Sequence, residues 1–236
     1  MNKHGVAIIG DGKMGQAIRQ LAVERGWRVT AIVGERESNR GAGINKQSLG
    51  APEVAVEFTQ PDAAVANIVA CLRGQVPVVV GTTGWYESLP VVMDIAKETG
   101  TPMLWSPNFS LGVNVLIELA RHAGALMRSF EDFDAHIVET HHTRKKDAPS
   151  GTAIAIAKAA SDALDRPIPT TSIRIGSVPG THELVFDGPF EQVSISHVAR
   201  DRRVFAEGAL KAAEWLIGRT GVFTMRDVLK PDTFKA

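Results

Sequence analysis

Residues 5–33 read GVAIIGDGKMGQAIRQLAVERGWRVTAIV, and this stretch decides the fold of the amino-terminal half of the chain. It opens on the continuous apolar run 6–9, which is typical of a buried strand in a parallel sheet. Residues 14–25 then repeat apolar side chains at helical spacing, and residues 29–33 predict a second strand. The stretch therefore predicts one strand–helix–strand unit of a parallel sheet.

The first strand ends in a glycine turn of the pattern G-x-G-x-x-G, formed by Gly10, Gly12 and Gly15. The first glycine allows a tight turn, the second lets a pyrophosphate approach the backbone, and the third lets helix and strand pack closely. The N–H groups at the following helix start attract the phosphates. Such glycines also serve as plain turn residues, but between a strand and a helix they predict a dinucleotide site. We expect the cofactor to contact the whole turn: Gly10, Asp11, Gly12, Lys13, Met14 and Gly15.

Two charged residues, Glu35 and Arg36, follow the second strand. An acid at this place accepts hydrogen bonds from the ribose hydroxyls of NAD, whereas an arginine pairs with the 2′-phosphate of NADP. The pair therefore predicts binding of NADH and/or NADPH. The alternative is a solvated pair of charges in a surface loop.

Strands and helices keep alternating along this part of the chain. Expected strands at 54–58, 77–80 and 103–105 are separated by expected helices, one of which begins at Pro61 while the other covers 87–99. This alternation predicts an α/β fold with a Rossmann-like, doubly wound parallel sheet.

Two loops follow strands on the same edge of this sheet, GTTGW at 81–85 and SPNF at 106–109. In open α/β sheets, ligands bind outside the carboxyl ends of the strands, so both loops should line the cofactor crevice. The alternative is that they only turn the chain. The expected cofactor contacts are Gly81, Thr82, Thr83, Ser106, Pro107, Asn108 and Phe109.

The pattern changes after residue 109. A long helix with an apolar stripe comes first, and the strand-like runs DAHIVETHH, IRIGSV, HELVFDG and QVSISHVA follow it. These runs predict a second, α+β domain with a mixed or antiparallel sheet. We place this domain at residues 110–206, inserted into a dinucleotide-binding domain at 1–109 and 207–236.

Residues 139–153, ETHHTRKKDAPSGTA, combine two histidines, a basic cluster and a helix start. Ser150 or Thr152 is a natural N-cap for the apolar helix that follows. A helix start that contains a glycine, here Gly151, is also an anion site. The histidines and lysines add charge-assisted donors and a group that transfers protons near neutral pH. This combination suits a small substrate with carboxylates; the alternative is a turn beside solvated basic residues.

These motifs together resemble the dihydrodipicolinate reductase family (4-hydroxy-tetrahydrodipicolinate reductase, DapB family). The resemblance runs nearly end to end, through GDGKMG, VEFTQP, GTTGW, SPNFSLGVN, HH-x-x-K-x-D-A-P-S-G-T, FAEGALKAAEWL and MRDVL. It implies reduction of dihydrodipicolinate, formed from 4-hydroxy-tetrahydrodipicolinate, to tetrahydrodipicolinate in diaminopimelate and lysine biosynthesis. It also implies NADH or NADPH as the reductant and a homotetramer built by the second domain, which binds the substrate.

The resemblance implies roles for individual residues as well. The acid/base groups are His141 and Lys145, and the substrate-carboxylate contacts are His142, Gly151 and Thr152. We add Ser150 and Thr83 as further substrate-binding candidates. Whether histidine, lysine or water protonates the product stays open. The chain departs from the family where GDGKMG is one residue shorter than the common G-x-x-G-x-x-G. It is also shortened after Arg36 and after Pro169.

The composition is that of an ordinary globular protein, with 44% hydrophobic and 22% charged residues. Because 26 basic residues balance 26 acidic ones, no net charge favours nucleic acid or a membrane surface. The single cysteine and the lack of a signal peptide or long apolar run favour a cytoplasmic protein. We predict no metal site, and take the remaining histidines as structural or exposed: His4, His122, His136, His182 and His197.

Two other functions fit part of the pattern. A related reductase of an amino-acid imine or semialdehyde, such as an aspartate-dehydrogenase-like enzyme, would not be expected to join HH-x-x-K to DAPSGT. A module that senses NAD(H) without turnover would keep the glycine turn, but it would have no reason to keep both His141 and Lys145.

Overall fold

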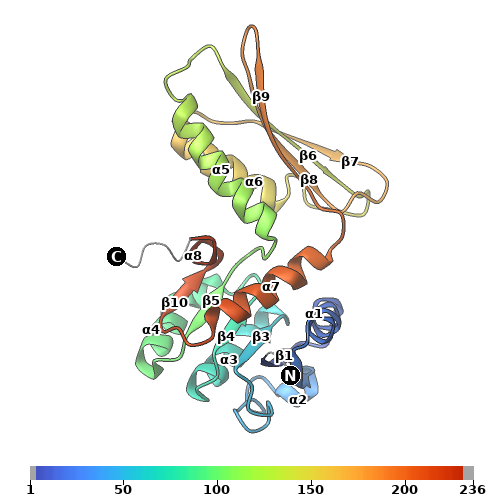
Figure 1. Cartoon of the computed structure of the whole chain (residues 1–236), viewed down its shortest axis with the longest axis vertical. Helices are drawn as coiled ribbons and strands as arrows, with labels where there is room; N and C mark the ends of the chain where they lie inside the picture. The colour runs from blue at the N-terminus through green and yellow to red at the C-terminus, as the bar shows by residue number, and fades with distance from the viewer. Residues whose placement is uncertain (1–3, 231–236) are drawn as a thin grey trace. The chain divides into compact units, whose positions relative to one another are not determined.

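The computed structural model describes residues 4–230, which form two compact units (Figure 1). The first unit runs to Phe109 and resumes at Phe205, and the second comprises Ser110–Val204. No helix within residues 4–230 is long and apolar enough to cross a membrane.

The first unit is built on a parallel sheet whose described strands lie in the order β10-β5-β4-β3-β1-β2. These strands are β1 (Gly5–Ile9), β2 (Arg28–Val33), β3 (Val54–Glu57), β4 (Val78–Val80), β5 (Met103–Trp105) and β10 (Val222–Thr224). The order reverses direction beside β1, because β2 pairs with one edge of β1 and β3 with the other. This arrangement confirms the predicted Rossmann-like sheet.

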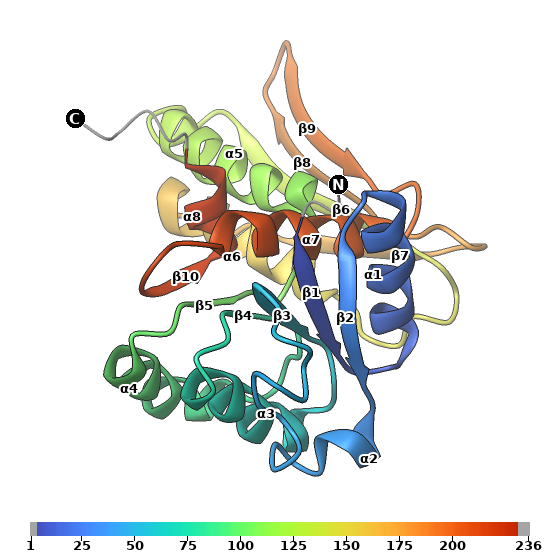
Figure 2. The same ribbon diagram turned by 60° about the horizontal axis from the view of Figure 1, so that its bottom comes forward.

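Helices cover both faces of this sheet. They are α1 (Lys13–Glu24), α2 (Glu35–Ser38), α3 (Pro61–Arg73), α4 (Leu89–Thr99), α7 (Arg203–Leu216) and α8 (Met225–Leu229), with a 3-10 turn η1 (Tyr86–Ser88). Because successive strand residues point to opposite faces, Ala7 and Ile9 pack in one buried cluster with Ile68 of α3. The intervening Ile8 lies beside Gly15 of α1. Figure 2 shows α3 and α4 on the side of the sheet away from α1.

The carboxyl-terminal segment joins this sheet through β10, a strand that the sequence did not predict. Its three residues are all only partly buried, and they pair with β5 at the edge of the sheet. So short a strand shows neither alternation nor a continuous buried run, which are the two signals of a strand.

The second unit packs two helices against one face of a mixed sheet (Figure 1). The sheet has the strand order β7-β6-β8-β9, with β6 (Asp134–His141), β7 (Thr170–Arg174), β8 (Thr181–Asp187) and β9 (Gln192–Val198). The helices are α5 (Leu111–Met127) and α6 (Gly151–Leu164). Leu116, Ile156, Ile137 and Phe186 meet in the core between helices and sheet. Since β6 and β7 are parallel and the other pairs antiparallel, the predicted mixed sheet is confirmed.

The strand expected from the run IRIGSV was wrong in its position. The strand instead comprises Thr170–Arg174, which pairs with Ile137–His141 of β6. The chain leaves the sheet before Gly176, whose backbone φ of 51° belongs to a turn. The apolar residues of the run suggested a later strand, whereas pairing with β6 selects the β-branched residues that precede them.

We predict that Gly124→Ala destabilises the second unit. Gly124 lies where α5 crosses α6, and a Cβ there would come within 2.5 Å of the Ala160 carbonyl oxygen. Alanine in place of glycine normally stabilises a helix by about 1 kcal/mol. Here the clash should cost about 1–3 kcal/mol, so the free energy of unfolding measured by denaturant titration should fall and not rise. Ala125→Gly, at the exposed neighbouring position of the same helix, measures the effect of helix propensity without a change in packing. A Gly124→Ala protein that is more stable than the wild type would contradict the prediction.

Candidate active site

A cavity of about 1080 Å³ opens in the first unit at the carboxyl ends of β1, β3 and β4. This volume is slightly above the range of about 300–1,000 Å³ that small-molecule sites span. The residues that line it are Gly10, Asp11, Gly12, Lys13, Met14, Glu35, Arg36, Ser38, Asn39, Arg40, Phe58, Thr59, Gln60, Pro61, Asp62, Ala63, Gly81, Thr82 and Thr83. The glycine turn, the charged pair Glu35 and Arg36, and the loop after β4 thus share one cavity.

The three glycines of the turn occupy different environments. Gly10 has a φ of 107°, and a Cβ on it would come within 2.0 Å of the Phe58 carbonyl oxygen. A Cβ on Gly15 would come within 1.9 Å of the Gly10 carbonyl oxygen, so this glycine lets α1 approach the strand end. Gly12, at the N-cap of α1, has no atom within 4 Å of an added Cβ. The space beside Gly12 is therefore open to a ligand.

A buried carboxyl group, Glu57, ends β3 next to the cavity-lining residues Phe58 and Thr59. Burial raises its pKa, and hydrogen bonds from neighbours such as Thr59 and Asn67 only partly oppose this. Thr59 also donates its N–H to Thr82 Oγ1 at 2.7 Å, and the Trp85 ring N–H donates to the Thr82 carbonyl at 2.8 Å. These bonds fix the loops after β3 and β4 relative to each other. The loop after β3 was missed, although the rule that selected GTTGW applies equally to VEFTQP.

The loop 106–109 does not line this cavity. Ser106 and Asn108 instead stabilise the turn, because the Ser106 hydroxyl donates to the Asn108 carbonyl at 2.7 Å. Phe109 packs its ring against Phe58, with the centroids 5.7 Å apart, and so contacts the cavity through another side chain. Neither Pro107 nor Gly15 is among the lining residues.

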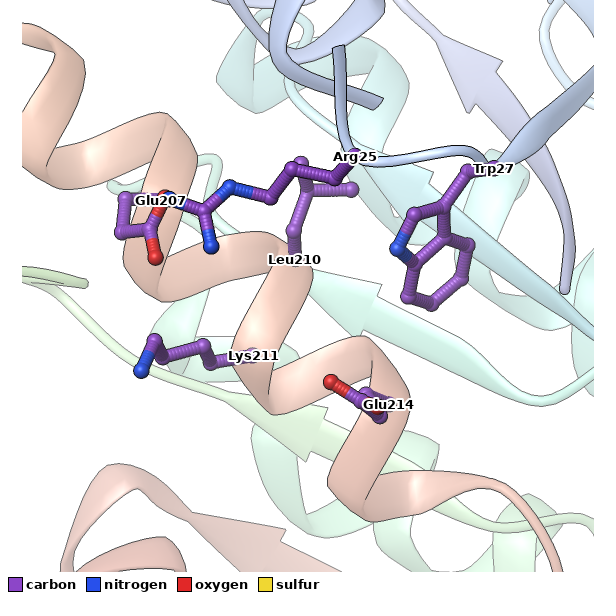
Figure 3. A pocket seen from close by; sticks show the side chains of 6 residues that line it. All are labelled: Arg25, Trp27, Glu207, Leu210, Lys211 and Glu214. Carbon is purple, nitrogen blue, oxygen red and sulfur yellow. The ribbon is translucent and has the colours of Figure 1, made fainter. Parts of the chain in front are cut away.

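A second cavity of the first unit, of about 390 Å³, lies between the end of α1 and the face of α7 (Figure 3). Arg25 reaches across it towards Glu207, with Nη2 and Oε2 2.5 Å apart. Trp27 and Leu210 form its apolar wall. The lining carries two basic residues, Arg25 and Lys211, and two acidic ones, Glu207 and Glu214, so it has no net charge.

The second unit holds a buried cluster of titratable side chains centred on Glu139. Glu139 and His141 are two residues apart on β6, so both side chains point to the same face of the sheet. Glu139 Oε2 lies 2.7 Å from His141 Nδ1 and 3.9 Å from His182 Nε2. Glu139 Oε1 accepts from Arg174 Nη2 at 2.7 Å and from the Ser150 N–H at 3.1 Å.

The charges of this cluster shift its pKa values in opposite directions. Burial alone would raise the pKa of Glu139, but the hydrogen bonds from Arg174, Ser150 and Ser172 and the charge of His141 lower it to about 2. Burial lowers the pKa of His182 to about 4, and His141 adds to the shift. Burial also lowers the pKa of His141, against the opposing effect of Glu139. Near neutral pH the cluster is one carboxylate beside two neutral imidazoles.

The start of α6 is held by the same cluster. Ser150 is its N-cap, because the hydroxyl accepts from the Ala153 N–H at 3.1 Å. The same hydroxyl lies 3.2 Å from His182 Nε2. Of the two caps that the sequence allowed, the structure uses Ser150, which leaves Gly151 and Thr152 in the first turn of the helix.

The loop between β6 and α6 carries Lys145 and His142. Lys145 Nζ donates to both carboxylate oxygens of Asp147, each at 2.8 Å, and its charge lowers the pKa of His141. His142 Nε2 lies 2.7 Å from Arg202 Nη2. Burial and the charge of Arg202 lower the His142 pKa. Thr83, the remaining substrate candidate, belongs to the first unit.

Sequence reasoning missed Glu139, Arg174, His182 and Arg202. His182, predicted to be structural or exposed, is buried in this cluster beside His141. Period-two alternation along DAHIVETHH would have placed Glu139 beside His141, but nothing local links either residue to the strands that carry Arg174 and His182.

Glu139, His141 and His182 also have the composition of a metal site, with one ligand atom of each within 4.8 Å of the others. Two ligands of a tetrahedral zinc ion would lie about 3.3 Å apart. The 2.7 Å contact between Glu139 and His141 is shorter than that, and Arg174 places a positive charge on the same carboxylate. This geometry favours a hydrogen-bonded ion-pair network.

A dinucleotide turn on a doubly wound sheet, together with an α+β unit that holds an acid/base cluster at a helix start, defines a nicotinamide-dependent oxidoreductase. Residues 4–109 match the family described as dihydrodipicolinate reductase, N-terminus, and residues 112–229 match its C-terminus. The chain belongs to the dihydrodipicolinate reductase family, as its motifs predicted. Members of this family use NADH or NADPH.

Named relatives agree with this assignment. The chain is 36% identical to the 4-hydroxy-tetrahydrodipicolinate reductase of Christiangramia forsetii, over 98% of this chain and 99% of the relative. It is 35% identical to the protein of that name from Zymomonas mobilis, over 95% of this chain and 96% of the relative. The dipicolinate-bound dihydrodipicolinate reductase from Paenisporosarcina sp. TG-14 shares the fold, with a TM-score of 0.77 and 22% identity over 96% of this chain and 99% of that chain.

The environments of Gly12 and Gly15 predict different outcomes for the same substitution. Gly12→Ala should leave the melting temperature unchanged and weaken NADH binding at least tenfold, because the added methyl occupies only space open to the ligand. Gly15→Ala should lower the stability of the first unit by about 1–3 kcal/mol, because its methyl meets the Gly10 carbonyl. Calorimetry and fluorescence titration with NADH measure the two effects. Equal losses of stability in both variants would contradict the assignment.

The lowered pKa of His182 predicts a pH-dependent stability of the second unit. Its folded pKa of about 4 lies below the ordinary 6.5, so the unfolded chain binds more protons between these values. Stability is therefore full above pH 6.5 and falls as the pH is lowered towards 4, by up to about 3 kcal/mol. Urea titrations of His182→Gln should give a shallower pH slope, whereas exposed His122→Gln should keep the wild-type slope. Identical slopes would contradict this account.

Proposed function

We propose that this chain catalyses the reaction for which its curated relatives are named, with the first unit binding NADH or NADPH and the second unit binding the substrate. The substrate is dihydrodipicolinate, formed from 4-hydroxy-tetrahydrodipicolinate, and the product is tetrahydrodipicolinate in diaminopimelate and lysine biosynthesis. The supporting observation is that β6, the loop after it and the start of α6 bring together His141, Lys145 and Ser150. These residues are the ones that match the family motif.

The chemistry of a conjugated cyclic imine fits these residues. When bound, the reduced nicotinamide supplies a hydride, which forms a new C–H bond while the electron pair of the conjugated system moves towards the ring nitrogen. A positioned acid must then deliver one proton to balance the reduction. His141 and Lys145 are the candidates, since each carries a transferable proton in its cationic form.

The substrate carries two carboxylates, and the second unit offers two kinds of partner for them. The first turn of α6, with Gly151 and Thr152, supplies backbone N–H groups and the positive end of a helix dipole. His142, Lys145 and Arg202 add cationic or neutral donors on the adjoining loops. A dianionic substrate is thus bound without a metal ion having to neutralise it.

We propose that the sheet of the second unit builds a homotetramer. The residues of β8 that point away from α5 and α6, Glu183 and Val185, are only partly buried, whereas the alternating Leu184 and Phe186 are fully buried. On the neighbouring strands this outer face carries further apolar side chains, among them Ile173 at 42% and Val198 at 60% exposure. A broad sheet face of this kind is suited to packing against another copy. We propose the cytoplasm as the compartment.

A coupled assay tests the function directly. Aspartate semialdehyde, pyruvate and a dihydrodipicolinate synthase generate the substrate in place, and loss of reduced-nicotinamide absorbance is followed with NADH and NADPH separately. We expect oxidation that depends on the synthase. No oxidation with either cofactor, from a folded protein that still binds NADH, would overturn the proposal and favour a different substrate or a sensor.

In this assay, Lys145→Ala should lower kcat by about 10²–10⁴-fold, the usual contribution of an acid/base group. NADH binding should be unchanged, because the cavity that the glycine turn lines contains no residue of the second unit. Lys146→Ala is the matched control, since Lys146 is the adjacent lysine and its side chain is exposed. A wild-type kcat in Lys145→Ala would remove Lys145 from the mechanism.

A further inference from the structure

We propose that Glu139 is the positioning residue of this active site, a single buried carboxylate that orients the His141 ring and anchors the start of α6. The inference rests on the proposed function, because it assigns a role relative to His141 as an acid/base group. It goes beyond the roles that the resemblance implied, which covered His141, His142 and Lys145 but not Glu139.

The two carboxylate oxygens of Glu139 contact different parts of the site. Oε2 lies 2.7 Å from His141 Nδ1, a close contact whose orientation does not meet hydrogen-bond geometry. Oε1 accepts the Ser150 N–H at 3.1 Å. Because Ser150 is the N-cap of α6, the same side chain fixes both the imidazole and the helix turn that we propose for substrate carboxylates.

This contact also determines which nitrogen of His141 faces outward. Nδ1 lies 2.7 Å from this carboxylate, although the ring as placed does not direct an N–H at Oε2. Because a carboxylate only accepts hydrogen bonds, we infer that Nδ1 carries the hydrogen in neutral His141. The proton that takes part in the reaction is then exchanged at Nε2. Gly180 flanks that nitrogen, and a Cβ there would lie 3.0 Å from it, so the small residue keeps this side of the ring accessible.

Arg174 connects Glu139 to the loop that carries Lys145. The Nη2 atom of Arg174 donates to Glu139 Oε1 at 2.7 Å and also to the Asp147 carbonyl at 2.6 Å. Asp147 in turn accepts from Lys145 through both carboxylate oxygens. A chain of short contacts therefore runs from His141 through Glu139 and Arg174 to Lys145, and it joins the two acid/base candidates.

The groups around the Glu139–His141 pair come from every strand and loop packed against it. They are Arg174 from β7, His182 from β8, His197 from β9, and Lys145 and Asp147 from the loop before α6. The cations Lys145 and Arg174 lower the pKa of His141, and Glu139 is the carboxylate that raises it. Removing its charge should therefore make His141 lose its proton at lower pH.

The test compares Glu139→Gln with Glu191→Gln, the same substitution at an exposed glutamate of the β8–β9 hairpin. In the coupled assay we expect Glu139→Gln to lower kcat by about 10–100-fold, as removal of an outer partner of a reactive histidine does. The high-pH limb of the kcat profile should move to lower pH, and NADH binding should not change. Glu139→Asp, which keeps the charge but not the reach, should retain more of the wild-type pH profile than Glu139→Gln does.

His141→Gln separates the two proposals. Wild-type turnover in that variant would contradict the acid/base role of His141 and thus the proposed function of the site. A large loss in His141→Gln combined with a wild-type kcat and pH profile in Glu139→Gln would overturn only the role of Glu139.

The wild-type protein provides a measurement that does not depend on the folding of any variant. Nitrogen-15 NMR of labelled histidine reports which ring nitrogen of His141 is protonated. We expect the Nδ1–H form for neutral His141. A neutral ring protonated at Nε2 would overturn the proposal even if Glu139→Gln failed to fold.

Discussion

A carboxylate with no exposed surface requires a cation, and the second unit is organised around that requirement at Glu139. Glu57 in the first unit shows what happens otherwise. It is equally buried, but its neighbours are hydroxyl and amide groups, and its pKa is raised. Glu139 has the guanidinium of Arg174 within 2.7 Å, and its pKa is lowered to about 2. The same side chain is thus ionised in one unit and favours the neutral form in the other.

The mixed pairing of the second sheet brings the partners of Glu139 together. A parallel β7 beside β6 places Arg174 next to His141 in register, and an antiparallel β8 places His182 opposite Glu139. The helix start that contains Ser150 supplies the remaining donor. Three segments outside β6 therefore converge on one side chain. Breaking any one of these contacts would leave a buried charge or polar group unpaired, which costs more than the contact itself contributes.

The sequence predicted those parts of the protein that local patterns encode. The glycine turn, the alternating strands of the first unit and the N-cap at Ser150 depend on residues within a few positions of one another, and the structure has them. Arg174 and His182 reach the site only through strand pairing, which single-sequence periodicity does not specify. The register of β7 was missed for the same reason, whereas β10 was missed because its three residues are too few to show a strand pattern. The loop 106–109 also follows a strand end, but the Ser106 hydroxyl bonds within the turn and no residue of this loop lines the cavity.

The cluster also explains how a histidine with a lowered pKa could serve as an acid. Burial and the charges of Lys145 and Arg174 lower the pKa of His141, so the ring is largely neutral in the free protein near pH 7. A substrate with two carboxylates would bring negative charge beside these cations and offset them, which favours the imidazolium form. Protonation of His141 would then follow substrate binding. Lys145 is paired with Asp147 before the substrate arrives, and a substrate carboxylate would compete with Asp147 for that ammonium group. The charge of the substrate would therefore change the state of both candidate proton donors, the protonation of His141 and the pairing of Lys145. Glu139 would keep the His141 ring in the same position during this change.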